Sequence, residues 1–481
     1  MKKFFFIAVL LSGVVFLNNC DMASSKNIDK PNILFIMVDD LGKEWISCYG
    51  AEDIKTPHID ALAKNGMKFN KAYSMPQCTP SRTTLLTGKY PFRTGWVNHW
   101  DVPRWGVGYF DWKHKRNMTF ASIMKTAGYT TAAAGKWQIS DFRIEPQAMK
   151  KHGFDDWCMW TGYEAQNKPS GARYQNAYIN RPATGSKAYK GQFGPDIYVD
   201  FLIDFMKKNK DKPMMLYFPM VLTHGPFVPT PDEPKVESDL DRHKAMVRYT
   251  DKLVGRLVKA LEDLGLRKKT FVIFTTDNGS GGRVSGHRNG RLVKGAKANE
   301  VEAGVCEPFI VSCPSVVASN VSTEALTDFS DLLPSFAELG GATLPEGLVV
   351  DGKSFVPHIL GKATDTPRDW ILAMGHGAAK LDEKGIRGRH DFMSRVIRDK
   401  QYKVWVDTNK KIVRLHDLIK DPYEETNLIN VKGMETVLNK FQKILDAQPD
   451  KDARPLYTKR QALPWDMSLK INKADKKKKD K

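Results

Sequence analysis

Closely spaced cysteine pairs are missing from this chain of 481 residues. None of its six cysteines forms a C-x-x-C pair, so the sequence signals neither a zinc site nor a disulfide framework. Internal repeats and nucleic-acid recognition motifs are missing as well, so we expect no nucleic acid among its partners. The net charge of +19 still favours anionic partners, although part of it lies in a lysine-rich tail, 466–481, that is predicted to be disordered.

The apolar run near the N-terminus is too short to span a membrane comfortably. Two lysines precede "FFFIAVLLSGVVFL", which is the pattern of a signal peptide over residues 1–20. Cys20 follows directly, which suggests lipid attachment, but asparagines replace the small residues usual before such a cysteine. Lipidation of Cys20 and plain secretion both stay open. Either way we expect an exported protein, periplasmic or at the cell surface, where anionic glycans are the commoner partners.

The pattern of apolar segments predicts an α/β fold. Near-continuous apolar runs at 32–38, 213–222 and 270–276 are typical of buried parallel strands. Helical patterns lie between them, so we expect a large, mainly parallel sheet flanked by helices in a catalytic domain, 21–365. Beyond it, two neighbouring antiparallel strands (394–407 and 411–418) and a helix (435–448) predict a smaller α+β subdomain, 366–465.

Acidic and amide side chains follow two of the predicted strands. Asp39-Asp40 and Asp277-Asn278 stand where parallel strands end, and the carboxyl ends of such strands form the ligand crevice of an open sheet. Carboxylates brought together repel unless a cation neutralises them, and oxygen ligands suit Ca²⁺ or Mg²⁺. Each pair alone is better explained as a turn or helix cap, whereas both together favour a metal site.

Cys78, in "QCTPSRTTLLTG", stands just before a predicted helix. Pro80 suits a first helical turn, so the helix is expected to begin at Ser81 with Cys78 outside it. Free amides at that end, together with Arg82, favour negative charge at the thiol. Two interpretations stay open: a thiolate nucleophile, or a small buried cysteine that packs a turn, which is the commoner case for an isolated cysteine.

Three more polar residues stand near predicted strand ends or in loops. They are Lys136, His224 and Lys297. Singly, each is better explained as a solvated lysine or a structural histidine. Together with Cys78 and a metal they indicate an anion-stabilising site with one candidate proton donor.

The same segments carry a resemblance to a known family. "CTPSRTTLLTG" matches the signature of the type I sulfatases of the alkaline-phosphatase superfamily, Cys-x-Pro-Ser-Arg followed by Thr-Gly. The likeness extends through "VDDLG", "GKW", "THGP", "TTDNG", a Lys-Gly-x-Lys loop and "LHDLIKDPYEETNL", from about residue 30 to 430. The resemblance implies an alkaline-phosphatase-like fold and a formylglycine-dependent sulfuric ester hydrolase.

The resemblance also implies a role for each candidate residue. A maturation enzyme would oxidise Cys78 to formylglycine before folding, and Arg82 would hold its hydrate, the nucleophile, beside the metal. Lys136 and Lys297 would neutralise sulfate oxygens, and His224 would protonate or stabilise the leaving alcohol. Calcium, preferred over magnesium, would be bound by Asp39, Asp40, Cys78, Asp277 and Asn278.

Two positions depart from the family pattern. Family members usually have histidine after Gly-Lys-Trp, where this chain has Gln138, which hydrogen-bonds but cannot take a proton. We therefore expect His287 or water to supply the base, or slower turnover. Cys306 stands where arginine is common, so the charge on the substrate side is expected to differ.

A tryptophan-rich segment, 95–112, predicts the sugar site. His99, Asp101 and Arg104 lie among its aromatic residues, and aromatic faces with polar edges suit a sugar, although packing beneath a long loop explains most of the rings equally well. Gln138, His287 and Arg288 are further candidates for substrate binding.

Three function classes fit the sequence. The first is a carbohydrate sulfatase acting on a sulfated polysaccharide or its oligosaccharides. The second is a phosphodiesterase or phosphonate monoester hydrolase of the same superfamily. The third, a non-catalytic glycan-binding relative, is disfavoured because the nucleophile and all four other metal-ligand candidates are present.

Overall fold

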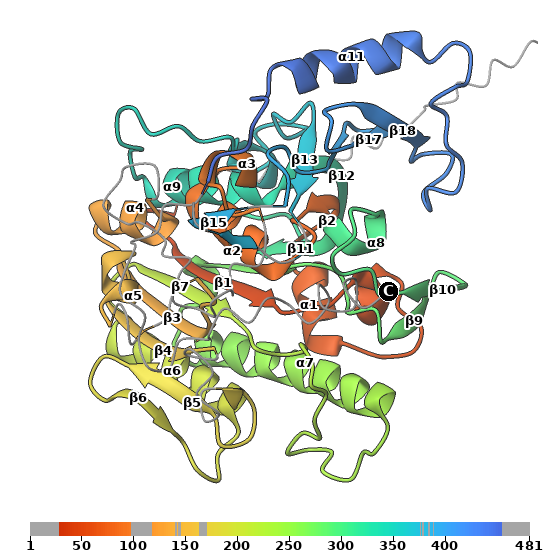
Figure 1. Ribbon diagram of the computed structural model, residues 1–481. Coiled ribbons are helices and arrows are strands. Elements are labelled where there is room, and N and C mark those ends of the chain that lie inside the picture. Colours follow the sequence, from red (N-terminus) through yellow and green to blue (C-terminus); the bar gives the residue numbers. More distant parts are fainter. Residues whose placement is uncertain are drawn as a thin grey trace, which may run out of the picture.

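A ten-stranded sheet forms the centre of the computed structural model (Figure 1). The structure describes residues 28–97, 118–139, 142, 146–162, 171–375, 377, 380–382, 385–387 and 389–454. The predicted signal peptide with Cys20 and the lysine-rich tail lie outside these residues. The strands are, in spatial order, β12 (Val321–Asp328), β2 (Met67–Tyr73), β11 (Cys306–Ser312), β8 (Thr270–Thr276), β1 (Asn32–Val38), β7 (Met214–Pro219), β3 (Thr130–Lys136), β4 (Asp156–Trp160), β5 (Tyr178–Arg181) and β6 (Gly185–Ala188).

The three strands predicted from apolar runs lie side by side in the middle of this sheet. β1 pairs in parallel with both β7 and β8, and every residue of these strands is buried. A strand that is covered on both faces has no polar side to alternate with, which explains the continuous apolar runs. The predicted α/β class with a mainly parallel sheet is confirmed.

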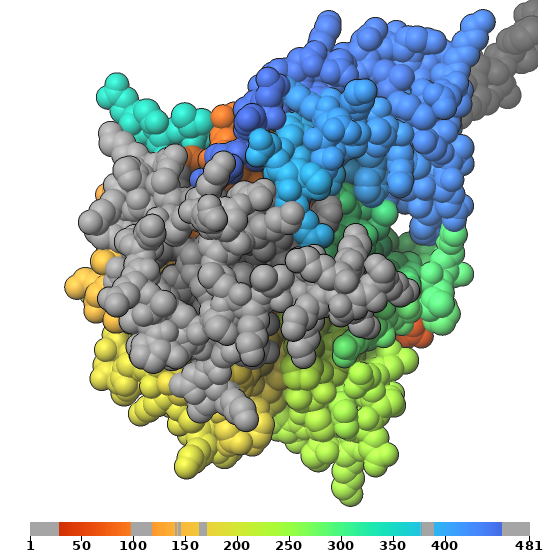
Figure 2. Space-filling model, viewed as in Figure 1, coloured from red at the N-terminus to blue at the C-terminus, as the bar shows by residue number. Residues whose placement is uncertain are grey.

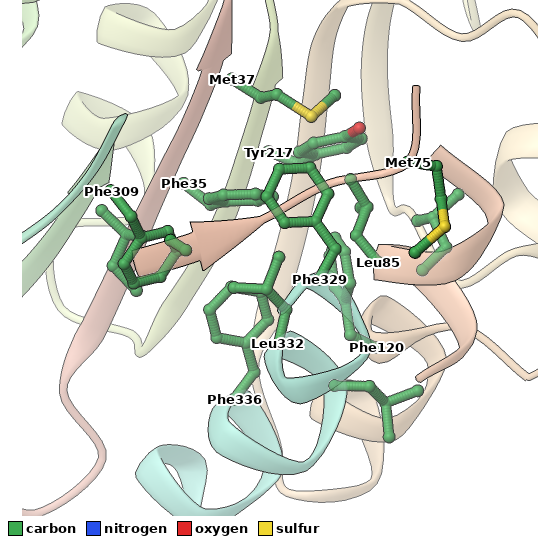
Figure 3. Packing of buried hydrophobic residues seen from close by; sticks show 14 of the residues in the cluster. Phe35, Met37, Met75, Leu85, Phe120, Tyr217, Phe309, Phe329, Leu332 and Phe336 are labelled. Carbon is green, nitrogen blue, oxygen red and sulfur yellow. The ribbon is translucent and has the colours of Figure 1, made fainter. Parts of the chain in front are cut away.

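Helices cover both faces of the sheet and bury alternate residues of each strand. One face carries α2 (Cys78–Thr87), α4 (Phe120–Thr126) and α9 (Leu332–Gly340), and the other carries α1 (Pro57–Lys64), α6 (Gly194–Lys208) and α7 (Asp239–Asp263). On the first face, Phe35 stacks on Tyr217 with ring centroids 5.5 Å apart and meets Phe336 edge-on (Figure 3). Its neighbours Leu34 and Ile36 pack into the core of the opposite face, as the two-residue period of a strand requires.

The chain after residue 370 adds a smaller antiparallel sheet. Its strands are β13 (Ile371–Met374), β16 (Arg395–Arg398), β17 (Tyr402–Val406) and β18 (Ile412–Asp417), and α11 (Glu435–Asp446) packs against it. Figure 2 shows these segments, in blue, at one end of the molecule. The prediction of one strand over 394–407 is wrong. Asp399 Oδ1 accepts hydrogen bonds from the amides of Gln401 and Tyr402, and this side-chain turn folds the segment into a hairpin.

Short elements connect these layers. They are η1 (Lys43–Trp45), η2 (Ser47–Tyr49), α3 (Pro91–Thr94), α5 (Ala148–Lys151), η6 (Arg267–Lys269), β9 (Ser285–Arg288), β10 (Arg291–Lys294), α8 (Glu302–Val305), η7 (Phe329–Asp331), α10 (Val356–Ile359), β14 (Lys380–Asp382) and β15 (Gly385–Arg387). Among the helices of the described ranges, none has both the length and the apolar character needed to cross a bilayer.

Candidate active site

Asp39-Asp40 and Asp277-Asn278 meet at one edge of the central sheet, which we call the acidic edge. Because β1 and β8 are parallel neighbours in register, Asp39-Asp40 and Asp277-Asn278 leave the sheet side by side. The backbone amide of Asp40 donates to Asp277 Oδ1 over 3.1 Å, and Asn278 Nδ2 donates to Asp40 Oδ1 over 2.8 Å. All four side chains are buried. The fold therefore brings these four side chains together, as the sequence suggested.

Cys78 is the first residue of α2 and faces this acidic edge. The helix begins three residues earlier than predicted, and Pro80 still lies in its first turn, where a missing N–H costs nothing. The Cys78 sulfur lies within 4.8 Å of carboxylate oxygens of both Asp39 and Asp277, and the cysteine is fully buried. Ser81 Oγ donates to the Asp277 carbonyl over 2.6 Å, which fixes α2 to the end of β8.

Arg82 and Lys136 bring two buried positive charges to the same carboxylates. Arg82 Nη2 donates to Asp277 Oδ2 over 2.7 Å and lies 3.6 Å from Asp39 Oδ1. Lys136, the last residue of β3, donates from Nζ to Asp39 Oδ2 over 2.7 Å, and its carbonyl accepts a hydrogen bond from Arg82 Nη1. The backbone of Lys136 therefore helps to hold Arg82, and the carboxylates of Asp39 and Asp277 hold both cations.

Lys297 and His224 complete the group from the side of Asp40. Lys297 Nζ donates to Asp40 Oδ1 over 2.6 Å and lies 3.9 Å from the Cys78 sulfur. His224 Nε2 lies 3.6 Å from Asp40 Oδ2, while its Nδ1 donates to the Gly225 carbonyl over 2.7 Å. Because a carbonyl only accepts, Nδ1 carries the proton and the neutral ring turns a bare Nε2 toward Asp40. Burial lowers the pKa of His224 to about 3, although Asp40 opposes this shift.

The electrostatics of these residues fit a bound cation. Burial, reinforced by the neighbouring charge of Asp39, raises the pKa of Asp277 well above its ordinary value. Burial also disfavours ionised Asp39, but the charges of Lys136, Arg82 and Lys297 outweigh it and hold its pKa below the ordinary value. Neither Asp39 Oδ1 nor Asn278 Oδ1 accepts a hydrogen bond from any residue in the described ranges. Buried oxygens without donors, beside a carboxyl that resists ionisation, are what a hard divalent cation would satisfy.

The other predicted site residues have different positions. Gln138 follows Lys136 at the same sheet edge and is buried. His287 and Arg288 lie in β9, where His287 contacts Asp53 and Arg288 Nε donates to the Tyr49 carbonyl. Within the described residues, neither His287 nor Arg288 makes a hydrogen bond or ion pair with the acidic edge. His99, Asp101 and Arg104 lie outside the described residues.

Cys306 has a lysine as its neighbour. Lys43 Nζ donates to the Cys306 sulfur over 2.9 Å and to the Asn70 carbonyl over the same distance. Lys43 therefore supplies a positive charge close to the position where the family pattern has arginine.

Sequence reasoning missed two residues beside the site, Arg173 and Tyr174. The Tyr174 hydroxyl lies 2.9 Å from the Val221 carbonyl and also contacts the carbonyl of His224, so its one proton is shared between them and it holds the segment that carries the histidine. Arg173 stacks on Trp160, the last residue of β4. The segment "GARYQNAY" carries no motif, so no local signal marked either residue.

Comparison with known proteins identifies the family. Residues 31–342 match the profile of a protein family described as "Sulfatase". The chain belongs to the sulfatase family. It is accordingly a sulfuric ester hydrolase, and the resemblance found in its motifs is confirmed.

Relatives match most of the chain. Steryl-sulfatase of Rattus norvegicus is 29% identical over 452 residues, which cover 76% of each chain. The N-acetylgalactosamine-6-O-sulfatase of Bacteroides thetaiotaomicron is 29% identical over 529 residues, covering 93% of this chain and 99% of the relative. The crystal structure of Ps i-CgsB with k-i-k-neocarrahexaose has a TM-score of 0.72 at 26% identity, covering 89% of this chain and 94% of that one. The predicted alkaline-phosphatase-like fold is confirmed.

Proposed function

We propose that this sulfatase is exported and hydrolyses sulfate esters of a sulfated polysaccharide or a derived oligosaccharide, with a formylglycine made from Cys78 and a bound Ca²⁺. Two of the three similar proteins above carry a carbohydrate in their names, an N-acetylgalactosamine sulfate and a neocarrahexaose. The net charge of +19 favours an anionic polymer as well. Steryl-sulfatase supplies the contrasting substrate class, a sulfated sterol.

The position of Cys78 carries this proposal. Its sulfur lies within 4.8 Å of carboxylate oxygens of Asp39 and Asp277, close enough for all three to share one cation, and 3.9 Å from Lys297 Nζ. A nucleophile at this atom therefore stands between a cation site and a fixed ammonium group. Cys78 is also fully buried, which supports oxidation by a maturation enzyme before the chain folds. Once hydrated, the formylglycine would supply a hydroxyl nucleophile in place of the thiol.

The chain's own residues would prepare the site for a sulfate ester. Asp39, Asp40, Asp277 and Asn278 would hold Ca²⁺, which would polarise the sulfate and lower the pKa of the attacking hydroxyl. With the carboxylates neutralised in this way, Lys136 and Lys297 would face the sulfate oxygens as uncompensated positive charges. Arg82, fixed by Asp277 and the Lys136 carbonyl, would hold the nucleophile in place.

His224 would serve the leaving alcohol. Its Nδ1 is committed to the Gly225 carbonyl, so Nε2 becomes a donor only when the ring takes a second proton. A bound sulfate ester adds negative charge beside the ring, which raises its pKa and favours that second proton. The imidazolium would then donate from Nε2 to the sugar oxygen as the S–O bond breaks.

The test combines mass spectrometry with a substrate panel. We expect the peptide covering residues 72–82 to contain formylglycine at position 78, and we expect sulfate release from sulfated mono- or oligosaccharides. Cys78→Ala should abolish release, whereas Cys313→Ala, which changes a buried cysteine in another part of the molecule, should retain it. Faster hydrolysis of an aryl phosphodiester or of a steroid sulfate, or full activity of Cys78→Ala, would refute the proposal.

A further inference from the structure

Arg173 is a buried arginine with no acidic partner among the residues that the structure describes. Arg173 is only 5% exposed, and neither its Nε nor its Nη1 makes a hydrogen bond. The guanidinium carbon lies over the Trp160 ring, 4.2 Å from its centre, which is within the range of a cation–π contact. Stacking compensates the charge in part but leaves those N–H groups without acceptors.

The backbone around Arg173 is fixed. The Ala172 carbonyl accepts a hydrogen bond from the Tyr178 amide, and the Tyr174 carbonyl accepts one from the Gly194 amide. A Cβ at Gly194 would lie 2.5 Å from the Arg173 carbonyl, so only glycine allows this close approach. The guanidinium is therefore presented from a rigid base, as a recognition residue requires.

Arg173 lies beside the active site. Trp160, on which it stacks, pairs across the sheet with Lys136, the lysine that contacts Asp39. The next residue in the chain is Tyr174, whose hydroxyl contacts the carbonyl of His224. Arg173, Asp39 and Asp40 all act electrostatically on the Tyr174 hydroxyl. Arg173 and Tyr174 thus adjoin both the strand that carries Lys136 and the segment that carries His224.

The acids of the site do not account for this cation. Asp39, Asp40 and Asp277 contact Lys136, Lys297 and Arg82 respectively, at 2.6–2.7 Å. Arg173 forms no ion pair within the part of the chain that the structure describes. A buried charge without an ion-pair partner and with two unsatisfied N–H groups is costly, and the partner that would remove this cost is an anion.

We propose that Arg173 binds a second anionic group of the sulfated sugar, a carboxylate or a further sulfate next to the ester that is cleaved. This inference rests on the proposed carbohydrate function and narrows it to sugars that carry two negative charges. The planar guanidinium group can form charge-assisted hydrogen bonds with either a carboxylate or a sulfate. Lys136, Lys297 and His224 would act on the reacting sulfate, and Arg173 would select the sugar.

Calorimetric binding to the full-length Cys78→Ala protein tests the proposal without turnover. The ligands are N-acetylgalactosamine 6-sulfate, its 4,6-disulfate, and the 6-sulfate linked to a uronic acid. We expect one of the doubly charged ligands to bind more tightly than the 6-sulfate, and the sugar that does so identifies the second anion. Adding Arg173→Gln should reduce that preference by about 10- to 100-fold, the value of a charged hydrogen bond.

Two further variants separate recognition from structure. Arg173→Lys keeps the charge and should restore part of the preference. Arg181→Gln is the matched control, because Arg181 also lies over an aromatic ring, 5.4 Å from the centre of Tyr189, but has a partner in the Cys158 sulfur. It should keep the full preference. Equal binding of singly and doubly charged sugars, or an equal loss for all ligands in Arg173→Gln, would overturn the proposal.

The proposed function fails by a different result. If the unmodified protein releases no sulfate from any of these sugars while the binding preference and its dependence on Arg173 persist, the carbohydrate sulfatase activity is refuted and the role of Arg173 in anion recognition is supported.

Discussion

Arg82 donates to Asp277 over 2.7 Å although the two residues are 195 positions apart in the chain. Arg82 lies in α2, four residues after Cys78, and Asp277 directly follows β8. Both side chains are at most 1% exposed. This buried ion pair joins the element that carries the candidate nucleophile to the strand end that carries a candidate metal ligand.

Replacing Arg82 with methionine should therefore damage both stability and activity. The substitution leaves Asp277 buried without its cation, and breaking a buried pair in this way costs about 3–5 kcal/mol of unfolding free energy. Urea denaturation and sulfate release measure the two effects. Arg93→Ala is the control, since Arg93 pairs with Asp351 while 44% exposed and should lose less than about 1 kcal/mol. Equal losses in both variants would contradict the role of the buried pair.

Removing calcium should lower both activity and thermal stability. A ligand that binds only the folded state adds about 2.7 kcal/mol when its concentration is a hundred times its Kd. We expect EGTA to lower Tm and stop sulfate release, and excess Ca²⁺ to restore both. Asp277→Asn should abolish the calcium-dependent Tm shift, whereas Asp351→Asn, which changes the carboxylate paired with Arg93, should preserve it. The same Tm in EGTA and in Ca²⁺ would rule out the cation site.

Gln138→His should increase the rate of sulfate release. A proton-transferring group is worth about 10²–10⁴-fold in other enzymes, and glutamine cannot provide one, so we expect a gain of at least about tenfold in kcat. The backbone tolerates the change, because Gln138 has φ of 63° and histidine is among the residues that accept this region. Gln138→Asn, which also accepts it but transfers no proton, should give no gain. An unchanged rate for Gln138→His would count against any catalytic cost at this position.

Acid should destabilise the protein in part through His243. Its ring lies between Trp45 and Phe227 with centroids 4.6 and 5.0 Å away, and burial lowers its pKa from 6.5 to about 3. Between these values the unfolded imidazole binds a proton and the folded one does not. The stability that this group contributes is therefore complete above pH 6.5 and is lost toward pH 3, at roughly 1.4 kcal/mol per pH unit.

His243→Phe isolates this contribution. The variant cannot take up a proton, so its unfolding free energy should fall by about 2 kcal/mol less than that of the unmodified protein between pH 6.5 and pH 5. Urea denaturation at several pH values provides the measurement, and His390→Phe, at an exposed position, is the control. Parallel pH profiles for His243→Phe and the unmodified protein would contradict the prediction.

The local sequence predicted the strands and the residues at their ends. Continuous apolar runs marked β1 and β8 because strands buried on both faces need no polar side, and parallel register then brought Asp39 and Asp277 together. The sequence also placed a helix after Cys78, but its start was wrong by three residues, since proline is allowed anywhere in a first turn.

Contacts between distant segments decided the rest. Three contacts depend on loops whose paths no local pattern encodes. They are Lys297 with Asp40, Lys43 with Cys306, and Arg173 with Trp160. The sequence by itself therefore determined the α/β class and the family and supplied the candidate site residues, because short-range periodicity and motif spacing carry that information. Only the tertiary structure decided which charges are paired and that Arg173 has no ion-pair partner among the described residues, because pairing depends on burial and on distances between segments far apart in the chain.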